Sequence, residues 1–392
     1  MTRLQRHMSS TRRIDPGELR RQLDQIVAAG APGAAAWTQD ETGAQQAASG
    51  VANLRTGQPM QPDLHFRAGS ITKSFVATVV LQLAADGRLS LQDTVERWLP
   101  RILPYGDQLT IRRLLNHTSG VPDYVPTVYQ TLYGSRSGRS RAWTPRELVA
   151  LVAGQPLRFP PGTSWSYANT GYILLGLIVE AATGRTLAQE LARRILEPLG
   201  LRGTRFPVNS PGIPMPRSRG YSLPQDPKGD VLGGPLLDLT AENPSWAGAA
   251  GALVSDLEDL TRFFRTLLGG RLLPPELLAE MLTTVPFPPG AVPLPLLDRY
   301  GLGLTEVDTP AGHLVGHPGG IPGFLSIVLS TPDGGRQLAL MINALYAPDP
   351  VYGAFIQAFR ELGMRLLVPV PPSATGRARR AAQDSTSNGT SG

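Results

Sequence analysis

Residues 67–75 read "RAGSITKSF" and place a serine and a lysine three positions apart, Ser70 and Lys73, in a mostly apolar run. The lysine is unusual, because only two of the 37 basic residues are lysine, Lys73 and Lys228. Arginine supplies charge as well as lysine does, but a buried lysine can also release its proton. Positions i and i+3 share a face of a helix. The stretch therefore predicts a helix over 70–85 whose first turn carries a reactive serine–lysine pair.

The composition is that of a globular protein with one large domain or two lobes. The chain has 392 residues, of which 41% are hydrophobic and 17% charged. Cysteine is absent, which excludes disulfides, thiolate catalysis and cysteine metal sites. The net charge of +6 reflects basic stretches near the two ends, which we interpret as solvated tails, so no nucleic-acid partner is expected.

Targeting signals are not recognisable in the sequence. No apolar run of about 18 residues occurs, so a membrane span is not expected. The basic N-terminus has no apolar segment behind it. We therefore expect a cytoplasmic protein if Met1 is the native start, and otherwise a secreted one.

Periodicity predicts strands near both ends of the chain and helices between them. Helical spacing covers 17–29 and 351–367, and alternating hairpin patterns cover 33–53 and 324–344. Helical patterns dominate from 70 to about 200. The predicted fold is α/β (α+β), an antiparallel sheet flanked by helices with an inserted, mostly helical lobe.

The Pro- and Gly-rich residues 205–245 predict a long surface excursion within that lobe. The predicted divisions of the chain are a flexible N-terminus (1–16), a catalytic domain (17–367) with an α/β part (about 17–85 and 250–367) and a helical lobe (about 86–249), and a disordered tail (368–392).

Ser70 has the surroundings that a nucleophile needs if it lies in the first turn of its helix. Free N–H groups and the helix dipole favour negative charge there, and the neighbouring Lys73 ammonium acts in the same direction. The alternative is a serine N-cap followed by a lysine that faces solvent.

A second candidate pair, Tyr167 and Asn169, precedes an apolar helix in "PGTSWSYANTGYILLG" at 161–176. Residues two apart in an extended segment point the same way, so a phenol and an amide can face one cleft. A nearby ammonium would lower the pKa of the phenol from about 10 and make it a usable base. The alternative is an asparagine N-cap beside a packed tyrosine.

A third candidate is "GHPGGIPGF" at 316–324, which leads into the second hairpin. Glycine leaves the backbone of such a strand open to a ligand, and this singles out His317 and Gly319. The alternative is a loop rich in turn residues. His313 and His317 have zinc-like spacing, but no third ligand is evident, so no metal site is predicted.

Together and in order, S-x-x-K, Y-x-N and H-x-G resemble the serine penicillin-recognising enzymes. The nearest branch contains class C β-lactamases, DD-carboxypeptidases, esterases, D-aminopeptidases and peptide cyclases. The similarity covers about residues 20–367 and includes "LLNHTSGVPDY" and "SWAGAAGALVSDLEDLTRFF". It implies a β-lactamase/DD-peptidase-like fold that needs no metal or organic cofactor.

The resemblance also implies a role for each candidate residue. Ser70 would form an acyl-enzyme, with Tyr167 as general base poised by Lys73, and Asn169 would position the substrate. The backbone N–H of Ser70 and one from the strand after His317 would form the oxyanion hole. His317 and Gly319 would flank the leaving group. Two aromatic residues, Tyr124 and Trp246, are candidates for lining the cleft, although core packing would explain them equally well.

Two departures from the DD-carboxypeptidase pattern concern the substrate's carboxylate. Thr305 stands after "YGLGL" where that branch has an arginine, with Glu306 beside it, and Pro318 replaces the threonine of H-T-G. Proline offers neither a hydroxyl nor an N–H. An unpaired carboxylate in a closed site would be costly, so the acyl-enzyme chemistry is predicted to act on bonds in substrates that lack this group.

The expected activity is that of a serine hydrolase or acyltransferase that cleaves amide, ester or thioester bonds of small peptide or acyl substrates with D-residues. One alternative is a thioesterase that releases or macrocyclises a nonribosomal peptide, with a peptidyl carrier protein as partner. A second alternative is a penicillin-binding sensor that is acylated but does not turn over.

Overall fold

The computed structural model describes residues 14–135, 137–226, 228, 230–288, 298–309 and 312–367. Most of the predicted flexible N-terminus and the whole predicted tail lie outside these residues. The division into an α/β part and a helical lobe stays a prediction.

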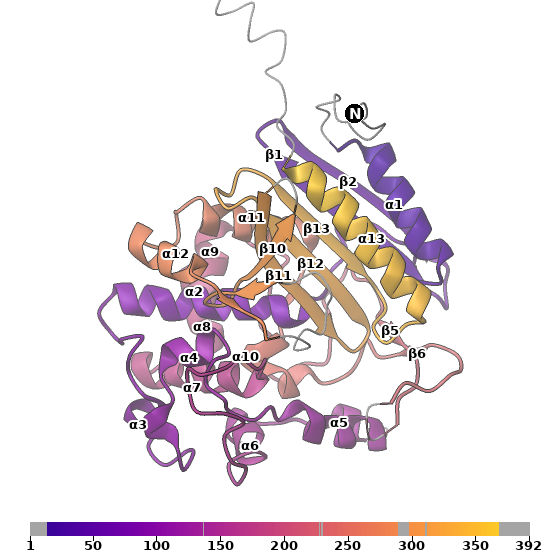
Figure 1. The fold of residues 1–392 in the computed structure, drawn as a ribbon. Coiled ribbons are helices and arrows are strands. Elements are labelled where there is room, and N and C mark those ends of the chain that lie inside the picture. Colours follow the sequence, from indigo (N-terminus) through magenta and orange to yellow (C-terminus); the bar gives the residue numbers. More distant parts are fainter. Residues whose placement is uncertain are drawn as a thin grey trace, which may run out of the picture.

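The described strands form one large antiparallel sheet and two small two-stranded sheets. The order in the large sheet is β3-β2-β1-β13-β12-β11-β10-β9-β8, so strands from both ends of the chain meet at the β1–β13 pair (Figure 1). This confirms the predicted antiparallel sheet flanked by helices. The strands of the large sheet are β1 (Gly33–Asp40), β2 (Gly43–Asn53), β3 (Gln58–Pro59), β8 (Val285–Pro286), β9 (Arg299–Tyr300), β10 (Thr305–Thr309), β11 (Gly312–Ile321), β12 (Phe324–Ser330) and β13 (Gln337–Ile342).

Both predicted hairpins are confirmed, and turn residues set their registers. The first runs from β1 into β2 with Asp40 opposite Gly43, and Gly43 has a φ of 123° that favours glycine. In the second, Ser330 pairs with Gln337 on either side of a turn that contains Gly334, whose φ is 69°. The two hairpins meet where β1 pairs with β13, so β1, β13 and β12 lie side by side in the centre of the sheet.

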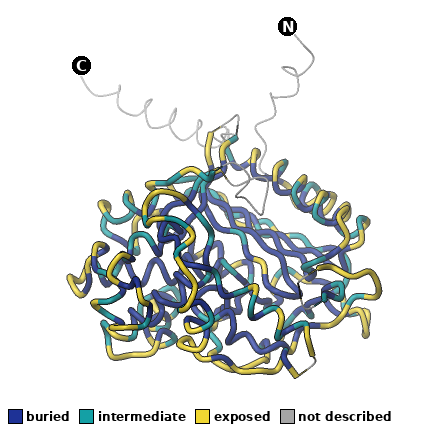
Figure 2. Tube along the Cα trace, turned by 60° about the horizontal axis from the view of Figure 1, so that its bottom comes forward, coloured by how far each residue is buried: buried dark blue, intermediate teal, exposed yellow. Residues whose placement is uncertain are grey.

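One face of the sheet is covered by α1 (Pro16–Ala28) and α13 (Asp349–Leu366), which lie side by side in Figure 1. Their apolar stripes pack on alternate residues of β13, such as Leu338 and Leu340. Such packing is the main source of stability for short helices. Figure 2 shows the result, with buried strands in the interior and exposed residues along the outer helices.

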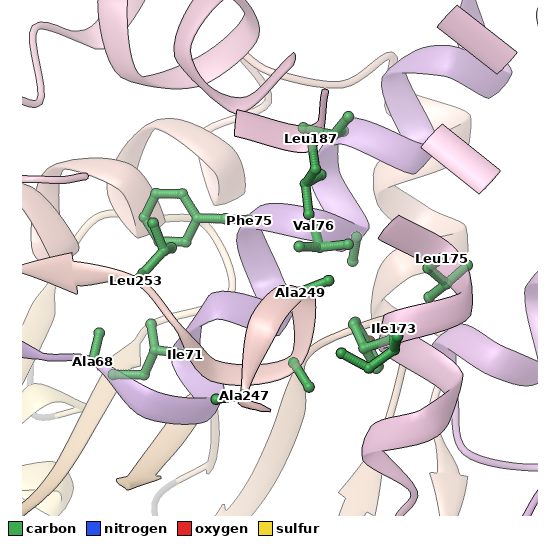
Figure 3. Close-up of a cluster of buried hydrophobic side chains, with 14 of the residues drawn as sticks. Ala68, Ile71, Phe75, Val76, Ile173, Leu175, Leu187, Ala247, Ala249 and Leu253 are labelled. Atoms are coloured by element: carbon green, nitrogen blue, oxygen red, sulfur yellow. The ribbon is translucent and has the colours of Figure 1, made fainter. Parts of the chain in front are cut away.

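The opposite face packs on α2 (Thr72–Ala85) and α11 (Leu257–Leu268). Phe75 stacks on Phe263 with ring centroids 3.7 Å apart. Figure 3 shows the core around Ile71, Phe75 and Val76, which also receives side chains from the helical elements that follow in the chain. Because this core contacts α2 on several sides, α2 is buried along most of its length and holds the serine–lysine pair rigidly.

The remaining described helices lie mostly below the sheet in the view of Figure 1. They are α3 (Val95–Trp98), α4 (Ile111–Leu115), α5 (Val125–Gly134), α6 (Pro145–Ala150), α7 (Asn169–Thr183), α8 (Leu187–Leu191), α9 (Glu197–Leu199), α10 (Gly248–Gly251) and α12 (Pro275–Leu282), together with short 3₁₀ turns η2 (Gly69–Ile71), η3 (Gly106–Gln108), η4 (Gly138–Ser140) and η6 (Pro244–Trp246) and the π-helical turn η5 (Ala192–Leu196).

In the described part of the chain no single helix is both long and apolar enough to cross a membrane. The bent pair Asn169–Thr183 and Leu187–Leu199, at 81°, meets the criterion only when the two helices are taken together, and only by length and composition.

The excursion at 205–245 lies closer to the body than a surface loop would. Its hairpin of β5 (Tyr221–Ser222) and β6 (Leu237–Asp238) is anchored through Tyr221, which bridges to Ala344, and Ser218 and Ser222 are fully buried. Strand β4 (Phe66–Arg67) pairs with β7 (Val254–Ser255) beside it. The expectation of a surface excursion was therefore wrong for Ser218 and β5, whereas β6 is exposed as expected.

Candidate active site

Ser70 lies in the 3₁₀ turn that leads directly into α2, as the sequence predicted for a serine at the start of a helix. The residues next to Ser70 hold this turn in place through their backbone conformation and hydrogen bonds. Gly69 has a φ of 55°, and the Thr72 hydroxyl donates to its carbonyl at 2.7 Å. The N–H of Ala68 donates to Leu253 O at 2.8 Å. These bonds hold the Ser70 hydroxyl at the wall of a cavity while leaving it partly exposed.

The Lys73 ammonium site is completely enclosed, which excludes the alternative of a solvent-facing lysine. Its Nζ lies 3.0 Å from Ser70 Oγ, 2.8 Å from Asn169 Oδ1 and 2.7 Å from Ala250 O. Burial lowers the pKa of Lys73 to about 7, and the nearby Asp123 opposes this effect. A neutral amine, which can accept a proton, is therefore well populated near neutral pH.

Asp123 fixes the orientation of the Asn169 side chain. Its carboxylate accepts from Asn169 Nδ2 at 3.0 Å and from the Asn169 backbone N–H at 3.1 Å. Because a carboxylate only accepts, the amide nitrogen must face Asp123 and the amide oxygen must face Lys73. Burial raises the pKa of Asp123, while its bonds with Asn169 lower it. Sequence reasoning missed this residue, although it stands in "LLNHTSGVPDY".

The Tyr167 ring lies 4.7 Å from Lys73 Nζ, so the structure brings the phenol into the serine–lysine site. The sequence led us to expect that the lysine would lower the pKa of the phenol. That expectation was wrong, because burial raises the pKa of Tyr167 and the hydrogen bond with Ser70 offsets only part of the rise. The phenol therefore stays protonated, and the low lysine pKa makes Lys73 the more available base.

His117 supports the Tyr167 segment from behind. Its Nδ1 accepts from the Ala168 N–H at 3.3 Å, its carbonyl accepts from the Ser166 N–H at 3.0 Å, and its ring lies 4.2 Å from the Tyr167 ring. The residue adopts a left-handed φ of 63°. Burial lowers the pKa of His117. These contacts give His117 a structural role beside the Tyr167 segment.

His317 lies in β11 and is neutral with a defined tautomer. Its Nδ1 lies 2.6 Å from Pro318 O, which can only accept, so Nδ1 carries the proton. Its Nε2 lies 2.8 Å from the Tyr300 hydroxyl and therefore accepts from it. Burial and the neighbouring Lys73 lower the pKa of His317 to about 3. The histidine thus orders the cavity wall without carrying charge.

The second half of β11 presents an open edge to the nucleophile. Pairing with β10 ends at Gly316, whereas pairing with β12 continues to Ile321. Hydrogen-bonded pairs alternate along an antiparallel ladder, and a two-residue loop flanks such a pair. Counting from Ile321, the N–H of Gly319 points to β12 and that of Gly320 to the open edge.

This arrangement explains the residue types of the H-P-G-G stretch. Pro318 lies on the open edge, where no strand needs its missing N–H. A Cβ on Gly319 would lie 2.0 Å from Ala68 O, and one on Gly69 would lie 2.8 Å from Gly320 N. Strand and nucleophile turn therefore approach each other closely, with the Gly320 N–H on the side of Ser70.

A cavity of about 540 Å³ opens over Ser70 and has two aromatic ends. At the first, which we call the His317 end, Trp165 lies 4.2 Å from Phe287 and 6.1 Å from Tyr300, measured between ring centroids. At the second, the Tyr346 end, the wall comprises Tyr129, Trp246, Ile321, Leu325, Leu345, Tyr346 and Tyr352. Among the described residues no Asp, Glu, Lys or Arg lines the cavity.

Comparison with known proteins identifies the family. The beta-lactamase family model matches residues 19–360. The chain belongs to the beta-lactamase family. Penicillin-binding protein 4 of Amycolatopsis lactamdurans is 30% identical over 351 residues, 84% of each chain. The esterase EstB of Burkholderia gladioli is 38% identical over 168 residues, which are 41% of this chain and 43% of the esterase. The match to penicillin-binding protein 4* of Bacillus subtilis, 28% identical, spans 75% of this chain and 64% of that protein.

Solved structures agree with this assignment. A D-stereospecific amidohydrolase from Streptomyces sp. superposes with a TM-score of 0.77 at 40% identity, covering 87% of this chain and 98% of its own. The D-amino acid amidase of Ochrobactrum anthropi SV3, complexed with L-phenylalanine amide, gives 0.76 at 31% identity, with 89% and 96% covered. SurE gives 0.65 at 31% identity, with 90% and 77% covered. The relatives and structural neighbours thus include an esterase, penicillin-binding proteins and amidases, and the chain spans less than two thirds of the length of the esterase and of the Bacillus subtilis protein.

Among the described residues that line the His317 end of the cavity, none has a basic side chain. Thr305 is buried, and its hydroxyl donates to Arg299 O at 3.1 Å. The guanidinium of Arg299, next to Tyr300 in β9, donates to Thr284 at 2.7 and 3.0 Å. Glu306 accepts from the Thr284 hydroxyl at 3.1 Å. The Arg299 guanidinium is therefore directed at Thr284, and Pro318 has no hydroxyl that could bind a substrate carboxylate.

The structure brings the predicted site residues together around this cavity. Ser70, Tyr167, Asn169 and His317 line it, and Lys73 lies just behind Ser70. Gly319 contributes through its close approach to Ala68 rather than through the lining. The two aromatic candidates also line the cavity, and the Tyr124 hydroxyl donates to Trp246 O at 2.6 Å.

Arg67, in the quoted stretch itself, links the nucleophile turn to the excursion. It is 2% exposed and donates through one nitrogen to Pro211 O (2.8 Å), Thr240 O (3.3 Å) and Glu242 O (2.8 Å). Burial lowers the pKa of Arg67 to about 10, well above neutrality. The cation thus holds three backbone carbonyls next to the segment that carries Trp246.

Proposed function

We propose that this protein hydrolyses amide and ester bonds of small acyl or peptide substrates that carry no free carboxylate next to the scissile bond, by way of an acyl-enzyme on Ser70. D-configured substrates are the first choice, because the similar solved structures include a D-stereospecific amidohydrolase and a D-amino acid amidase.

The hydrogen bonding of Lys73 carries the proposal. A neutral amine has two N–H donors and one lone pair. Ala250 O and Asn169 Oδ1 can only accept, so they take both donors. The lone pair is then left for the hydroxyl proton of Ser70 at 3.0 Å. A pKa of about 7 makes this form abundant at neutral pH.

Acylation follows from this arrangement. Lys73 takes the Ser70 proton as Oγ attacks the substrate carbonyl carbon. The N–H groups of Ser70 and Gly320 stabilise the resulting oxyanion. Tyr167 donates its phenolic proton to the leaving nitrogen or oxygen and recovers one from Lys73. The carbonyl–heteroatom bond breaks, and the acyl group remains on Ser70.

Deacylation runs through the same groups in reverse. A water molecule in the place of the leaving group attacks the acyl carbon, and Tyr167 takes its proton while passing the phenolic proton to Lys73. The bond between the acyl carbon and Ser70 Oγ then breaks, Lys73 returns the proton to Oγ, and the free acid leaves.

The His317 end is the leaving-group end. It offers aromatic surface from Trp165, Phe287 and Tyr300 and a neutral His317. A free carboxylate would be desolvated there without a cation. The leaving groups of amides, anilides and esters carry no carboxylate and therefore need no cation at this end. This contrast favours an amidase or esterase over a DD-carboxypeptidase.

A substrate panel tests the proposal. We expect the protein to hydrolyse D-alanine p-nitroanilide and D-phenylalanine amide, and to cleave a D-Ala-D-Ala peptide at least about a hundredfold more slowly, since an unpaired buried charge costs several kcal/mol. Mass spectrometry should find the acyl group on Ser70, and Ser70→Ala should abolish labelling. Faster release of D-alanine from the peptide would contradict the proposal.

A thioesterase or peptide cyclase is the second candidate. The neutral, aromatic leaving-group end suits a thiol leaving group, which needs no counter-ion and little protonation. A peptidyl thioester mimic tests it by separating free acid from cyclised product. Turnover of anilides without any turnover of the thioester would exclude it.

A further inference from the structure

A buried carboxyl group lies directly behind the Tyr346 end of the cavity. Glu242 is 5% exposed, and its Oε1 accepts from Trp246 Nε1 at 2.8 Å. Its Oε2 is buried and has no hydrogen-bond partner in the described part of the chain. The catalytic mechanism does not use this group. A buried carboxyl oxygen without a hydrogen-bond partner is unfavourable unless another interaction offsets the cost of its desolvation.

Three tyrosines surround this carboxyl. Its charge contributes to the raised pKa of Tyr129, Tyr133 and Tyr346, for all of which burial is the main cause. Tyr129 and Tyr346 line the cavity, and the Tyr133 hydroxyl is a second buried group without a partner among the described residues. The Tyr346 end thus has aromatic faces in front and an acidic group behind.

The two arginines whose charges act on this carboxyl do not bond to it. Arg67 and Arg139 lower the pKa of Glu242, but burial dominates and raises it to about 7. Arg67 donates through Nη2 to three carbonyls, including that of Glu242 itself, while its Nε and Nη1 are buried and have no hydrogen-bond partner in the described part of the chain. Among the described residues neither arginine forms an ion pair with Glu242 within 4.0 Å. The Oε2 atom of Glu242 therefore remains available to a hydrogen-bond donor.

We propose that the Tyr346 end binds a primary ammonium group carried by the acyl half of the substrate. Trp246, Tyr129 and Tyr346 would surround the cation with their ring faces, which attract ammonium ions. Glu242 would supply the opposite charge from behind, where a low dielectric strengthens the attraction. This inference rests on the proposed function, since it assigns the acyl half to this end.

Access to Glu242 runs past Tyr346. The Tyr346 hydroxyl bonds the Tyr129 hydroxyl at 3.3 Å, which is long for a pair of hydroxyl groups. Tyr346 also has a left-handed φ of 53°. Movement of this one side chain opens the wall, and the ammonium then replaces the hydroxyl contact.

The test compares two series of N-acyl-D-alanine p-nitroanilides. One series carries ω-aminoalkanoyl chains, and the matched series carries a methyl group in place of each ammonium. We expect a kcat/KM at least about tenfold higher for the best ammonium substrate than for its neutral partner, as for a desolvated cation–aromatic contact. Glu242→Gln keeps the acceptor for Trp246 but removes the opposite charge, so it should reduce this ratio severalfold, while the aromatic side chains remain in place. Glu276→Gln, an exposed carboxylate on α12, is the control for net charge.

The outcomes separate the two proposals. If neither series is hydrolysed, the proposed function fails. If both series are hydrolysed equally by the wild-type protein, only the ammonium site is overturned, whether or not Glu242→Gln folds. A ratio that survives Glu242→Gln would also overturn it, and a preference for the neutral series would show that the pocket takes apolar acyl chains.

Discussion

The polar cluster at Ser70 and the His317 end of the cavity differ in how completely their polar groups are paired in hydrogen bonds. Around Ser70 each donor of Lys73 has an acceptor, and Asp123 fixes the one amide that could turn. At the His317 end the wall is aromatic, and the guanidinium of Arg299 donates to Thr284. In the proposed function the first region transfers a proton, whereas the second disfavours a charged leaving group.

The difference separates chemistry from substrate choice. A reaction that moves a proton among the three side chains Ser70, Lys73 and Tyr167 tolerates little variation in their contacts. The wall at the His317 end only selects the leaving group, so its polarity can change without altering the contacts around Ser70. Changes to the first region should therefore alter the rate for every substrate, and changes to the second should alter the order of substrates.

The largest effect is expected for Lys73. Lys73→Met removes the lone pair, and Lys73→Arg keeps a charge that cannot be lost. Both should lower kcat with D-alanine p-nitroanilide by at least about a thousandfold. Lys228→Met changes the second lysine, which is exposed, and should leave kcat unchanged. Full activity in Lys73→Arg would refute the role given to the amine.

A smaller and selective loss is expected for Tyr167→Phe. The phenol donates a proton to the leaving group, and general acid catalysis contributes about a hundred- to ten-thousandfold. We expect a loss of about a hundredfold or more with an unactivated D-amino acid amide and a much smaller loss with a thioester, whose thiolate leaves without protonation. Rate ratios for the two substrates measure this. Equal losses on both would show that Tyr167 has another role.

The pH dependence should follow the lysine. The pKa of Lys73 is lowered to about 7, and the neutral form is the active one. As pH falls through 7, protonation removes the base, so kcat/KM should drop about tenfold per pH unit and reach about a hundredth of its plateau at pH 5. Above neutrality it should level off. A profile that stays flat from pH 5 to 8 would contradict a neutral lysine.

The smallest effect is expected at the His317 end of the cavity. Pro318→Thr adds a hydroxyl and an N–H on the open edge of β11, beside the place of the leaving group. A hydrogen bond to a charged group contributes about 1.5 kcal/mol or more, so cleavage of a D-Ala-D-Ala peptide should rise about tenfold. Hydrolysis of D-phenylalanine amide should stay the same. A rise for both substrates would indicate a general change in the strand.

Much of this architecture follows from local sequence signals. The hairpins at 33–53 and 324–344 follow from alternation and turn residues, and the helix after Ser70 follows from its apolar run. The pairing of Ser70 with Lys73 was also predictable, because it depends on helical spacing alone. Each of these features involves residues close together in the chain.

The remaining features depend on contacts between distant segments. Asp123 meets Asn169 across 46 positions, and Arg67 meets Glu242 across 175. The direction of the Tyr167 pKa depends on how deeply the phenol is buried, which spacing does not reveal. Tyr129, Tyr346 and Phe287 line the cavity, yet in the sequence they are indistinguishable from core aromatics.

The Arg67 anchor has a consequence for how the excursion can be altered. The guanidinium holds main-chain carbonyls at Pro211, Thr240 and Glu242, so it recognises the course of the backbone and not the side chains. Arg67 therefore places no demand on the side chains at these three positions. Within residues 205–245, exposed positions such as Val231 and Leu232 are the ones to vary, because buried side chains such as Tyr221 also hold the excursion in place.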